Sequence, residues 1–121
     1  MNNLILLRHG QSQWNLENRF TGWEDIPLTK LGFDEAKKAG KLMVKNNIKI
    51  DIIFSSVLKR ANKTAELAIK EMNLPNFWKE NELVMTKNKS LNERDYGELV
   101  GLNKEETSNK YGKEQVHIWR R

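Results

Sequence analysis

The sequence predicts an α/β protein in which a mostly parallel sheet is flanked by helices. Two short apolar runs, residues 3–7 and 51–55, are typical of buried strands. Between them, residues 29–46 carry apolar side chains at helical spacing, with Thr29 as N-cap. A helix between two parallel strands makes a βαβ unit, which is right-handed by default.

The later elements are predicted from cap residues, apolar spacing and helix breakers. They are a helix from Ser55 or Ser56 to Asn73, a third strand at 83–85, a loop over 88–101, a helix from Asn103 to Gly112 and a last helix toward Trp119. The chain stops in that last helix, and three parallel strands with open edges would invite unwanted pairing. We therefore expect a truncated chain.

Length and composition limit the function classes. The 121 residues suffice for one domain or part of one, and carry a net charge of +5. Lys and Arg are interleaved with Asp and Glu, which favours small anions over nucleic acid as partners. The chain has no cysteine, so a reducing cytoplasm is the expected setting. No apolar stretch has the roughly 18 residues of a membrane span, and no signal peptide is recognisable, so we expect no membrane partner.

The most informative motif is Arg8-His9-Gly10, directly after the apolar run at 3–7. Side chains at the carboxyl end of a parallel strand face the crevice where α/β proteins bind ligands. An arginine fork fits phosphate oxygens, and a neutral imidazole can accept a phosphoryl group. Taken alone, the tripeptide is equally compatible with an ordinary histidine and a solvated arginine.

Four longer strings extend the motif, and they occur in one order along the chain. They are RHGQSQWN at 8–15, SVLKRA at 56–61, NERDYGELVGLNK at 92–104 and KYGKEQVHIWRR at 110–121. Together they resemble the histidine phosphatase superfamily, in particular its 2,3-bisphosphoglycerate-dependent phosphoglycerate mutases, from Leu4 to Arg121. Two positions depart from that pattern: Gln11 replaces a usual glutamate, and Asp95 stands where histidine is common.

The resemblance implies a three-layer, phosphoglycerate mutase-like fold, of which residues 1–121 are the N-terminal portion of a single domain. It implies interconversion of 3-phosphoglycerate and 2-phosphoglycerate, as in glycolysis and gluconeogenesis, with 2,3-bisphosphoglycerate as primer and no metal. His9 is the implied nucleophile, Arg8 and Arg60 bind the phosphoryl group, and Glu93 moves the proton. The other implied substrate-binding residues are Ser12, Asn15, Thr21, Gly22, Arg94, Asp95, Tyr96, Lys104, Arg120 and Arg121.

Two alternatives stay open. Water could attack the phosphohistidine, which would make the chain a phosphatase of the same superfamily. The chain could also be a non-catalytic anion-binding remnant, because the AAHGNS-like string that carries the family's second histidine does not occur in it. We expect small phosphorylated three-carbon acids as ligands, a homo-oligomer if the protein is full length, and a structural role for His117.

Overall fold

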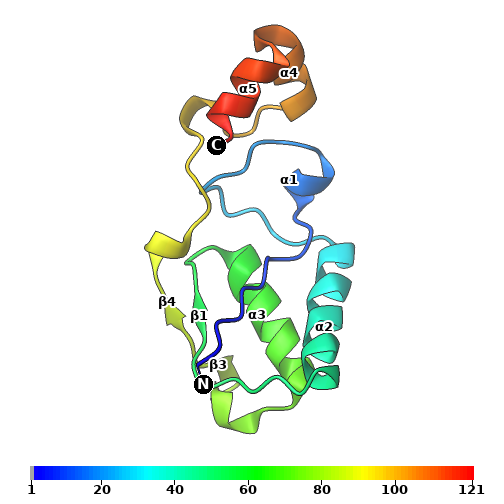
Figure 1. The fold of residues 1–121 in the computed structure, drawn as a ribbon, viewed down its shortest axis with the longest axis vertical. Helices are drawn as coiled ribbons and strands as arrows, with labels where there is room; N and C mark the ends of the chain where they lie inside the picture. The colour runs from blue at the N-terminus through cyan, green and yellow to red at the C-terminus, as the bar shows by residue number, and fades with distance from the viewer. Residues whose placement is uncertain (1) are drawn as a thin grey trace.

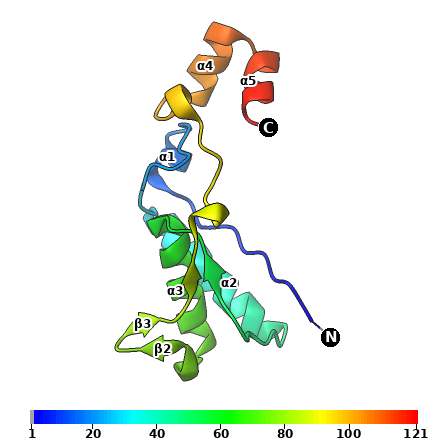
Figure 2. The same ribbon diagram turned by 90° about the vertical axis from the view of Figure 1, so that its left-hand side faces the viewer.

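Two long helices form the larger part of the molecule. The computed structural model describes residues 2–121, and in it α2 (Lys30–Lys45) and α3 (Lys59–Met72) lie side by side (Figures 1 and 2). The side chain of Thr29 accepts a hydrogen bond from the Gly32 N–H at the start of α2. The predicted helix and its cap are therefore confirmed.

The second long helix begins later than predicted. It ends before Asn73, which takes the left-handed conformation with φ of 53°. At its other end, the hydroxyl of Ser56 accepts a hydrogen bond from the Leu58 N–H at 3.3 Å. This local turn occupies residues 56–58, so neither serine caps the helix and α3 starts at Lys59.

The strands are short and form two separate pairs. They are β1 (Phe54–Ser55) parallel to β4 (Thr86–Lys87), and β2 (Trp78–Lys79) antiparallel to β3 (Glu82–Leu83). Phe54 lies opposite Thr86, and α3 connects β1 to the later strands. The predicted strand at 51–55 is thus reduced to two residues. Of the strand predicted at 83–85, only Leu83 lies in a strand, β3. The parallel partner of β1 is instead β4, which follows at Thr86–Lys87.

The first predicted strand is wrong. Residues 3–7 have no strand assignment, and Leu4 and Leu6 are 84% and 85% exposed. Figure 2 shows this segment running away from the helices toward the N-terminus. A strand needs a neighbour for its backbone N–H and C=O groups, and no segment among the described residues pairs with it. The βαβ unit expected around α2 is therefore not closed, and residues 2–121 supply one helical layer, one parallel strand pair and one antiparallel strand pair.

A helical hairpin lies at one end of the molecule, and β3 lies near the opposite end (Figure 1). It consists of α4 (Lys104–Tyr111) and α5 (Lys113–Trp119), separated by Gly112 with φ of 90°. The side chain of Asn103 caps α4, as predicted. The remaining short elements are α1 (Gln13–Leu16), and 3-10 turns at Pro75–Phe77, Lys89–Leu91 and Gly97–Leu99. Over residues 2–121, no helix combines the length and apolar content that crossing a bilayer requires.

Backbone hydrogen bonds join the hairpin to the N-terminal part. The Phe20 N–H donates to the Leu102 carbonyl at 2.9 Å, and the Gly101 N–H donates to the Phe20 carbonyl at 2.7 Å. The Lys104 N–H donates to the Asn18 carbonyl at 2.7 Å. The ring of Phe20 is fully buried. These contacts bring the start of α4 toward the segment that follows His9.

Gly40 sets how closely α2 approaches α3. A Cβ at this position would overlap the backbone carbonyl of Ala68, which cannot move as a flexible side chain can. We expect Gly40→Ala to lower the free energy of unfolding by about 1–3 kcal/mol, despite the better helix propensity of alanine. Urea unfolding followed by tryptophan fluorescence measures it. Lys41→Ala, at an exposed neighbouring position, should change stability by less than about 0.5 kcal/mol, and equal effects of both variants would contradict the close packing.

Candidate active site

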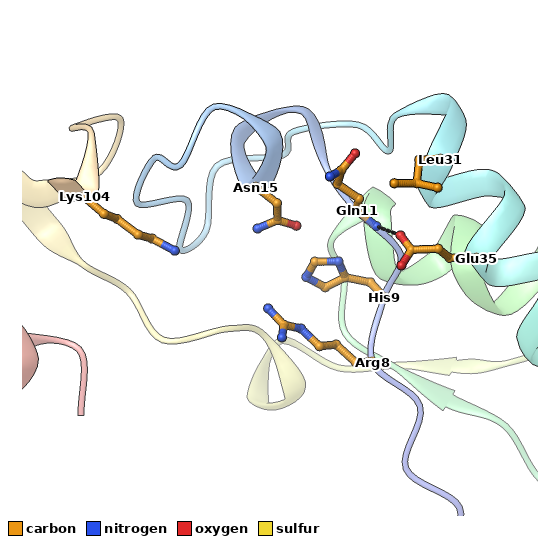
Figure 3. A pocket seen from close by; sticks show the side chains of 7 residues that line it. All are labelled: Arg8, His9, Gln11, Asn15, Leu31, Glu35 and Lys104. Atoms are coloured by element: carbon orange, nitrogen blue, oxygen red, sulfur yellow. Dashed lines mark hydrogen bonds between the residues drawn. The ribbon is translucent and has the colours of Figure 1, made fainter.

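A polar cavity of about 360 Å³ opens beside His9 (Figure 3). It is lined by Arg8, His9, Gln11, Asn15, Leu31, Glu35 and Lys104. Four of these residues belong to the motif at 8–15, two to the start of α2, and the last to α4. In Figure 3 the side chains of Arg8 and His9 lie next to each other, and Lys104 reaches toward them from the opposite side. Arg8 and His9, which the sequence predicts to bind phosphate, therefore line the same concavity.

The backbone after His9 is held against both long helices. A Cβ at Gly10 would overlap the backbone of Gly32 in α2, so only glycines permit this approach. The Gly10 N–H donates to the hydroxyl of Thr64 in α3 at 3.1 Å, and the Gln11 N–H donates to the carboxylate of Glu35 at 2.9 Å. Contacts to two helices thus fix the position of His9 although the segment before it is unpaired.

Gln11 shows how the departure from the usual glutamate is accommodated. Its side-chain oxygen accepts a hydrogen bond from the Thr29 hydroxyl at 2.8 Å, and its backbone carbonyl accepts one from the Thr29 N–H at 2.9 Å. An amide oxygen and a carboxylate oxygen can both accept such a bond. The substitution therefore keeps the contact between the motif and the cap of α2.

His9 is held in the form that suits a nucleophile. Its Nδ1 lies 2.6 Å from the Gly10 carbonyl oxygen, which can only accept, so Nδ1 carries the hydrogen and Nε2 keeps its lone pair. Burial lowers the pKa of His9, and the Arg60 and Arg8 cations lower it further. The hydrogen bond to Gly10 and the Glu93 carboxylate oppose this shift without reversing it. The neutral imidazole is therefore favoured at neutral pH.

This pKa shift has a measurable consequence. The neutral form of His9 persists below the ordinary histidine pKa of about 6.5, so the imidazolium form should accumulate only below that pH. Arg8→Gln removes a cation that lowers the pKa of His9, so this pKa should rise in the variant. An NMR titration of the His9 ring in both proteins measures the shift directly. A His9 pKa above the ordinary value, or no change on substitution, would contradict this account.

Arg60 and Glu93 form an ion pair; neither residue lines the cavity, although both charges act on the pKa of His9. Arg60 Nη2 lies 2.8 Å from Glu93 Oε2, and the Arg60 side chain is only 1% exposed. The guanidinium also donates to the Gly22 carbonyl at 2.6 Å and to the Glu24 carbonyl at 2.7 Å. Arg60 is not among the residues that line the cavity at His9, so its predicted phosphate contact stays a prediction. What the structure shows is a cation that holds Glu93 and the Gly22 loop.

Ser12 and Asn15 cap the short helix α1 instead of both facing the cavity. The Asn15 N–H donates to the Ser12 hydroxyl at 3.2 Å, and the Ser12 N–H donates to Asn15 Oδ1 at 2.9 Å. Ser12 is fully buried and does not line the cavity. Asn15 does line the cavity, and it uses its Oδ1, not its Nδ2, in the bond to Ser12.

Thr21, Gly22 and Tyr96 lie where the N-terminal part meets the 92–104 segment. Thr21 is buried, and Gly22 has φ of 58°, where an added Cβ would lie 3.1 Å from the Arg94 carbonyl oxygen and 3.2 Å from the Tyr96 backbone nitrogen. The ring of Tyr96 packs on Phe20 with centroids 5.1 Å apart. None of the three predicted residues lines the cavity at His9, so their substrate contacts remain predictions.

Arg94 and Asp95 are exposed and make local contacts. Arg94 donates to the Trp119 carbonyl at 3.3 Å, which ties the 92–104 segment to the end of α5. The carboxylate of Asp95 accepts from the Gly97 N–H at 2.9 Å and so shapes the turn. Neither residue lines the cavity.

Lys104 is the cation from the C-terminal part that reaches the cavity. Burial lowers the pKa of Lys104, and the Arg120 and Arg8 cations lower it further, while Glu93 opposes them. The ammonium therefore lies within electrostatic reach of both Arg8 and Arg120. Arg120 and the exposed Arg121 are not among the residues that line the cavity at His9.

Of the residues that line the cavity, Gln11 lies in the predicted motif but was not predicted to bind a ligand, and sequence reasoning missed two others, Leu31 and Glu35. They lie four positions apart in α2, and residues at this spacing share a helix face. Their distance from the predicted cap Thr29 places them in the first two turns, next to the motif that the cap contacts. Their position within two turns of the predicted cap is the sequence signal that could have identified them. His117, expected to be structural, is exposed and lines a second cavity.

The chain is similar to known proteins along almost its whole length. The sequence profile of the histidine phosphatase superfamily (branch 1) matches residues 4–121, almost the whole chain. The match includes the motif at 8–15, Arg60, the 92–104 segment and the end of α5.

Solved structures show the same α/β, phosphoglycerate mutase-like fold. A mycobacterial glucosyl-3-phosphoglycerate phosphatase is 26% identical with a TM-score of 0.73, over 90% of this chain and 49% of its own. YhfR of Bacillus stearothermophilus is 28% identical with a TM-score of 0.72, over 93% and 50%. Phosphoserine phosphatase of Entamoeba histolytica is 28% identical with a TM-score of 0.63, over 83% and 44%.

The chain thus spans about half the length of these solved structures. Its motifs nevertheless occur in order, and its cavity gathers the arginine and histidine of the first motif with a lysine of the third. The extent of the profile match and these residues lead to one conclusion. The chain belongs to the histidine phosphatase superfamily.

Proposed function

We propose that this protein hydrolyses phosphate monoesters through a phosphohistidine at His9. The observation that carries the proposal is the hydrogen bond from Nδ1 to the Gly10 carbonyl, which leaves Nε2 unprotonated beside Arg8 in an open cavity. The similarity to a glucosyl-3-phosphoglycerate phosphatase and a phosphoserine phosphatase supports water as the final acceptor. This favours the phosphatase alternative over the mutase.

The proposed reaction has two steps. In the first, Nε2 of His9 attacks phosphorus, the bond between phosphorus and the ester oxygen breaks, and Glu93 gives a proton to the leaving alkoxide. In the second, water attacks the phosphohistidine, the P–N bond breaks, and Glu93 takes the proton from water. Arg60 holds Oε2 of Glu93, so Oε1 is the oxygen we expect to carry the proton. Arg8 and Lys104 offset the charge on the phosphoryl oxygens.

We propose small phosphorylated acids as substrates. Phosphoserine and glucosyl-3-phosphoglycerate, named for two of the solved relatives, each contain a phosphate ester and a carboxylate. In this chain Arg8 and Lys104 face one cavity from opposite sides and take part in no ion pair within residues 2–121. Two separated cations suit a ligand with two anionic groups.

A second candidate is the phosphoglycerate mutase reaction. It is favoured by the 92–104 segment, which resembles that of the mutases and places Lys104 in the cavity with His9. The unpaired Arg8 and Lys104 fit 2,3-bisphosphoglycerate, which would supply the priming phosphoryl group when bound.

One experiment separates the two reactions. The protein is incubated with 3-phosphoglycerate, with and without 2,3-bisphosphoglycerate, and both inorganic phosphate and 2-phosphoglycerate are measured. The proposal predicts release of phosphate in both cases. Formation of 2-phosphoglycerate that depends on 2,3-bisphosphoglycerate would support the mutase, and the absence of both products would support the non-catalytic remnant.

A further inference from the structure

The peptide unit that joins Gly10 to Gln11 is bound by a side chain at each end. Its carbonyl oxygen lies 2.6 Å from Nδ1 of His9, and its N–H donates to Oε1 of Glu35 at 2.9 Å. The dashed line in Figure 3 marks the second of these bonds. The carboxylate of Glu35 is therefore connected to the imidazole of His9 through a single peptide unit.

The direction of the Gly10 carbonyl depends on such an anchor. Gly10 has no Cβ, so its backbone can adopt more conformations than that of other residues. The Thr64 hydroxyl accepts from the Gly10 N–H, and the Thr29 N–H donates to the Gln11 carbonyl, but these groups belong to the peptide units before and after this one. Rotation of the unit between them would turn the Gly10 carbonyl away from His9.

Helix α2 places Glu35 at this peptide unit. The helix and the motif are in close backbone contact, since an added Cβ at Gly32 would overlap the Gln11 carbonyl. Glu35 follows Gly32 by three positions and so lies on the same side of the helix. Its carboxylate takes part in no ion pair within residues 2–121, so no lysine or arginine of this part of the chain offsets its charge.

We propose that Glu35 is a positioning residue for the reaction at His9 and acts through the peptide unit between Gly10 and Gln11. A carboxylate that accepts from the N–H of a peptide unit polarises it and strengthens the hydrogen bond that its carbonyl accepts. The Gly10 carbonyl then keeps the hydrogen on Nδ1 of His9, which leaves the lone pair on Nε2. The effect on the reaction rests on the proposed phosphatase function, whereas the effect on the tautomer does not.

Three substitutions separate the acceptor from its charge. Glu35→Leu removes both, and it should fold because Glu35 is exposed and leucine favours helices. Glu35→Gln removes the charge and keeps an oxygen that can accept from the Gln11 N–H. Asp34→Leu is the matched control, because Asp34 is the neighbouring exposed carboxylate of α2 and forms no ion pair within residues 2–121.

The tautomer of His9 is the first readout, measured by ¹⁵N NMR of the ring at mildly alkaline pH without substrate. The hydrogen should stay on Nδ1 in the unaltered protein, in Asp34→Leu and in Glu35→Gln, whereas Glu35→Leu should move a large share of it to Nε2. The proposal is overturned if Glu35→Leu keeps the hydrogen on Nδ1, or if Asp34→Leu or Glu35→Gln shifts the tautomer as far as Glu35→Leu does.

Release of inorganic phosphate from 3-phosphoglycerate is the second readout. Glu35→Leu should lower kcat about tenfold or more and leave KM within about twofold, because His9 is misoriented whereas the cations that bind the substrate are unchanged. Glu35→Gln should lower kcat by about threefold at most. A protein that hydrolyses no ester would contradict the proposed function, and the tautomer would still decide the role of Glu35.

Discussion

His9→Asn should lower the rate of phosphate-monoester hydrolysis by about three orders of magnitude or more, because it removes the nucleophile that both proposed steps require. Asparagine is similar in size and can still donate to the Gly10 carbonyl, so the fold around the motif should survive. Release of inorganic phosphate from 3-phosphoglycerate, at saturating substrate, measures the effect.

The control for this variant is Lys70→Gln, at an exposed position in the last turn of α3. It removes a positive charge without touching the cavity, so both the rate and the unfolding transition should match those of the unaltered protein. If His9→Asn keeps more than about a tenth of the original rate while Lys70→Gln keeps all of it, a nucleophilic role for His9 is excluded.

Arg60→Met should have the largest effect on stability, with a loss of about 3 kcal/mol in the free energy of unfolding. The substitution leaves the carbonyls of Gly22 and Glu24 without their donor and releases the carboxylate of Glu93. Hydrolysis should also slow by about a hundredfold, since Glu93 is no longer held for proton transfer. Urea unfolding and phosphate release measure the two effects.

Glu93→Gln separates the two roles of this ion pair. The amide oxygen can still accept from Arg60, and the side chain is 37% exposed, so stability should fall by only about 1 kcal/mol. The amide cannot carry the transferred proton, so the rate should fall about 10²- to 10⁴-fold. Unchanged stability in Arg60→Met, or an unchanged rate in Glu93→Gln, would contradict the roles assigned to the pair.

Helices could be predicted from this sequence more reliably than strands, for a physical reason. The helix after Thr29 and the one after Asn103 carry their caps and spacing within a single segment, and both appear in the structure. An apolar run such as residues 3–7 predicts burial only if other segments pair with it and cover it. Among the described residues none does, and Leu4 and Leu6 are exposed.

In the predicted site, too, residues of one local motif could be predicted, whereas contacts between distant segments could not. The motif at 8–15 carried enough information to find His9 and Arg8, which line one cavity. The role of Arg60 could not be predicted, because its carbonyl partners lie in another segment and depend on the loop at Gly22. The position of His117 beside a second cavity could not be predicted, because its neighbours there include residues of α4 and of the turn after α1, which only the folded chain brings together.

The central claim is that His9 carries the phosphoryl group, and mapping the covalent intermediate tests it most directly. The protein is mixed rapidly with 3-phosphoglycerate, quenched at alkaline pH at a series of short times, and digested for peptide mass spectrometry. The account predicts a transient phosphoryl group on His9 that is absent from His9→Asn. Release of phosphate without any phosphoryl group on His9, or a phosphoryl group on a different residue, would contradict it.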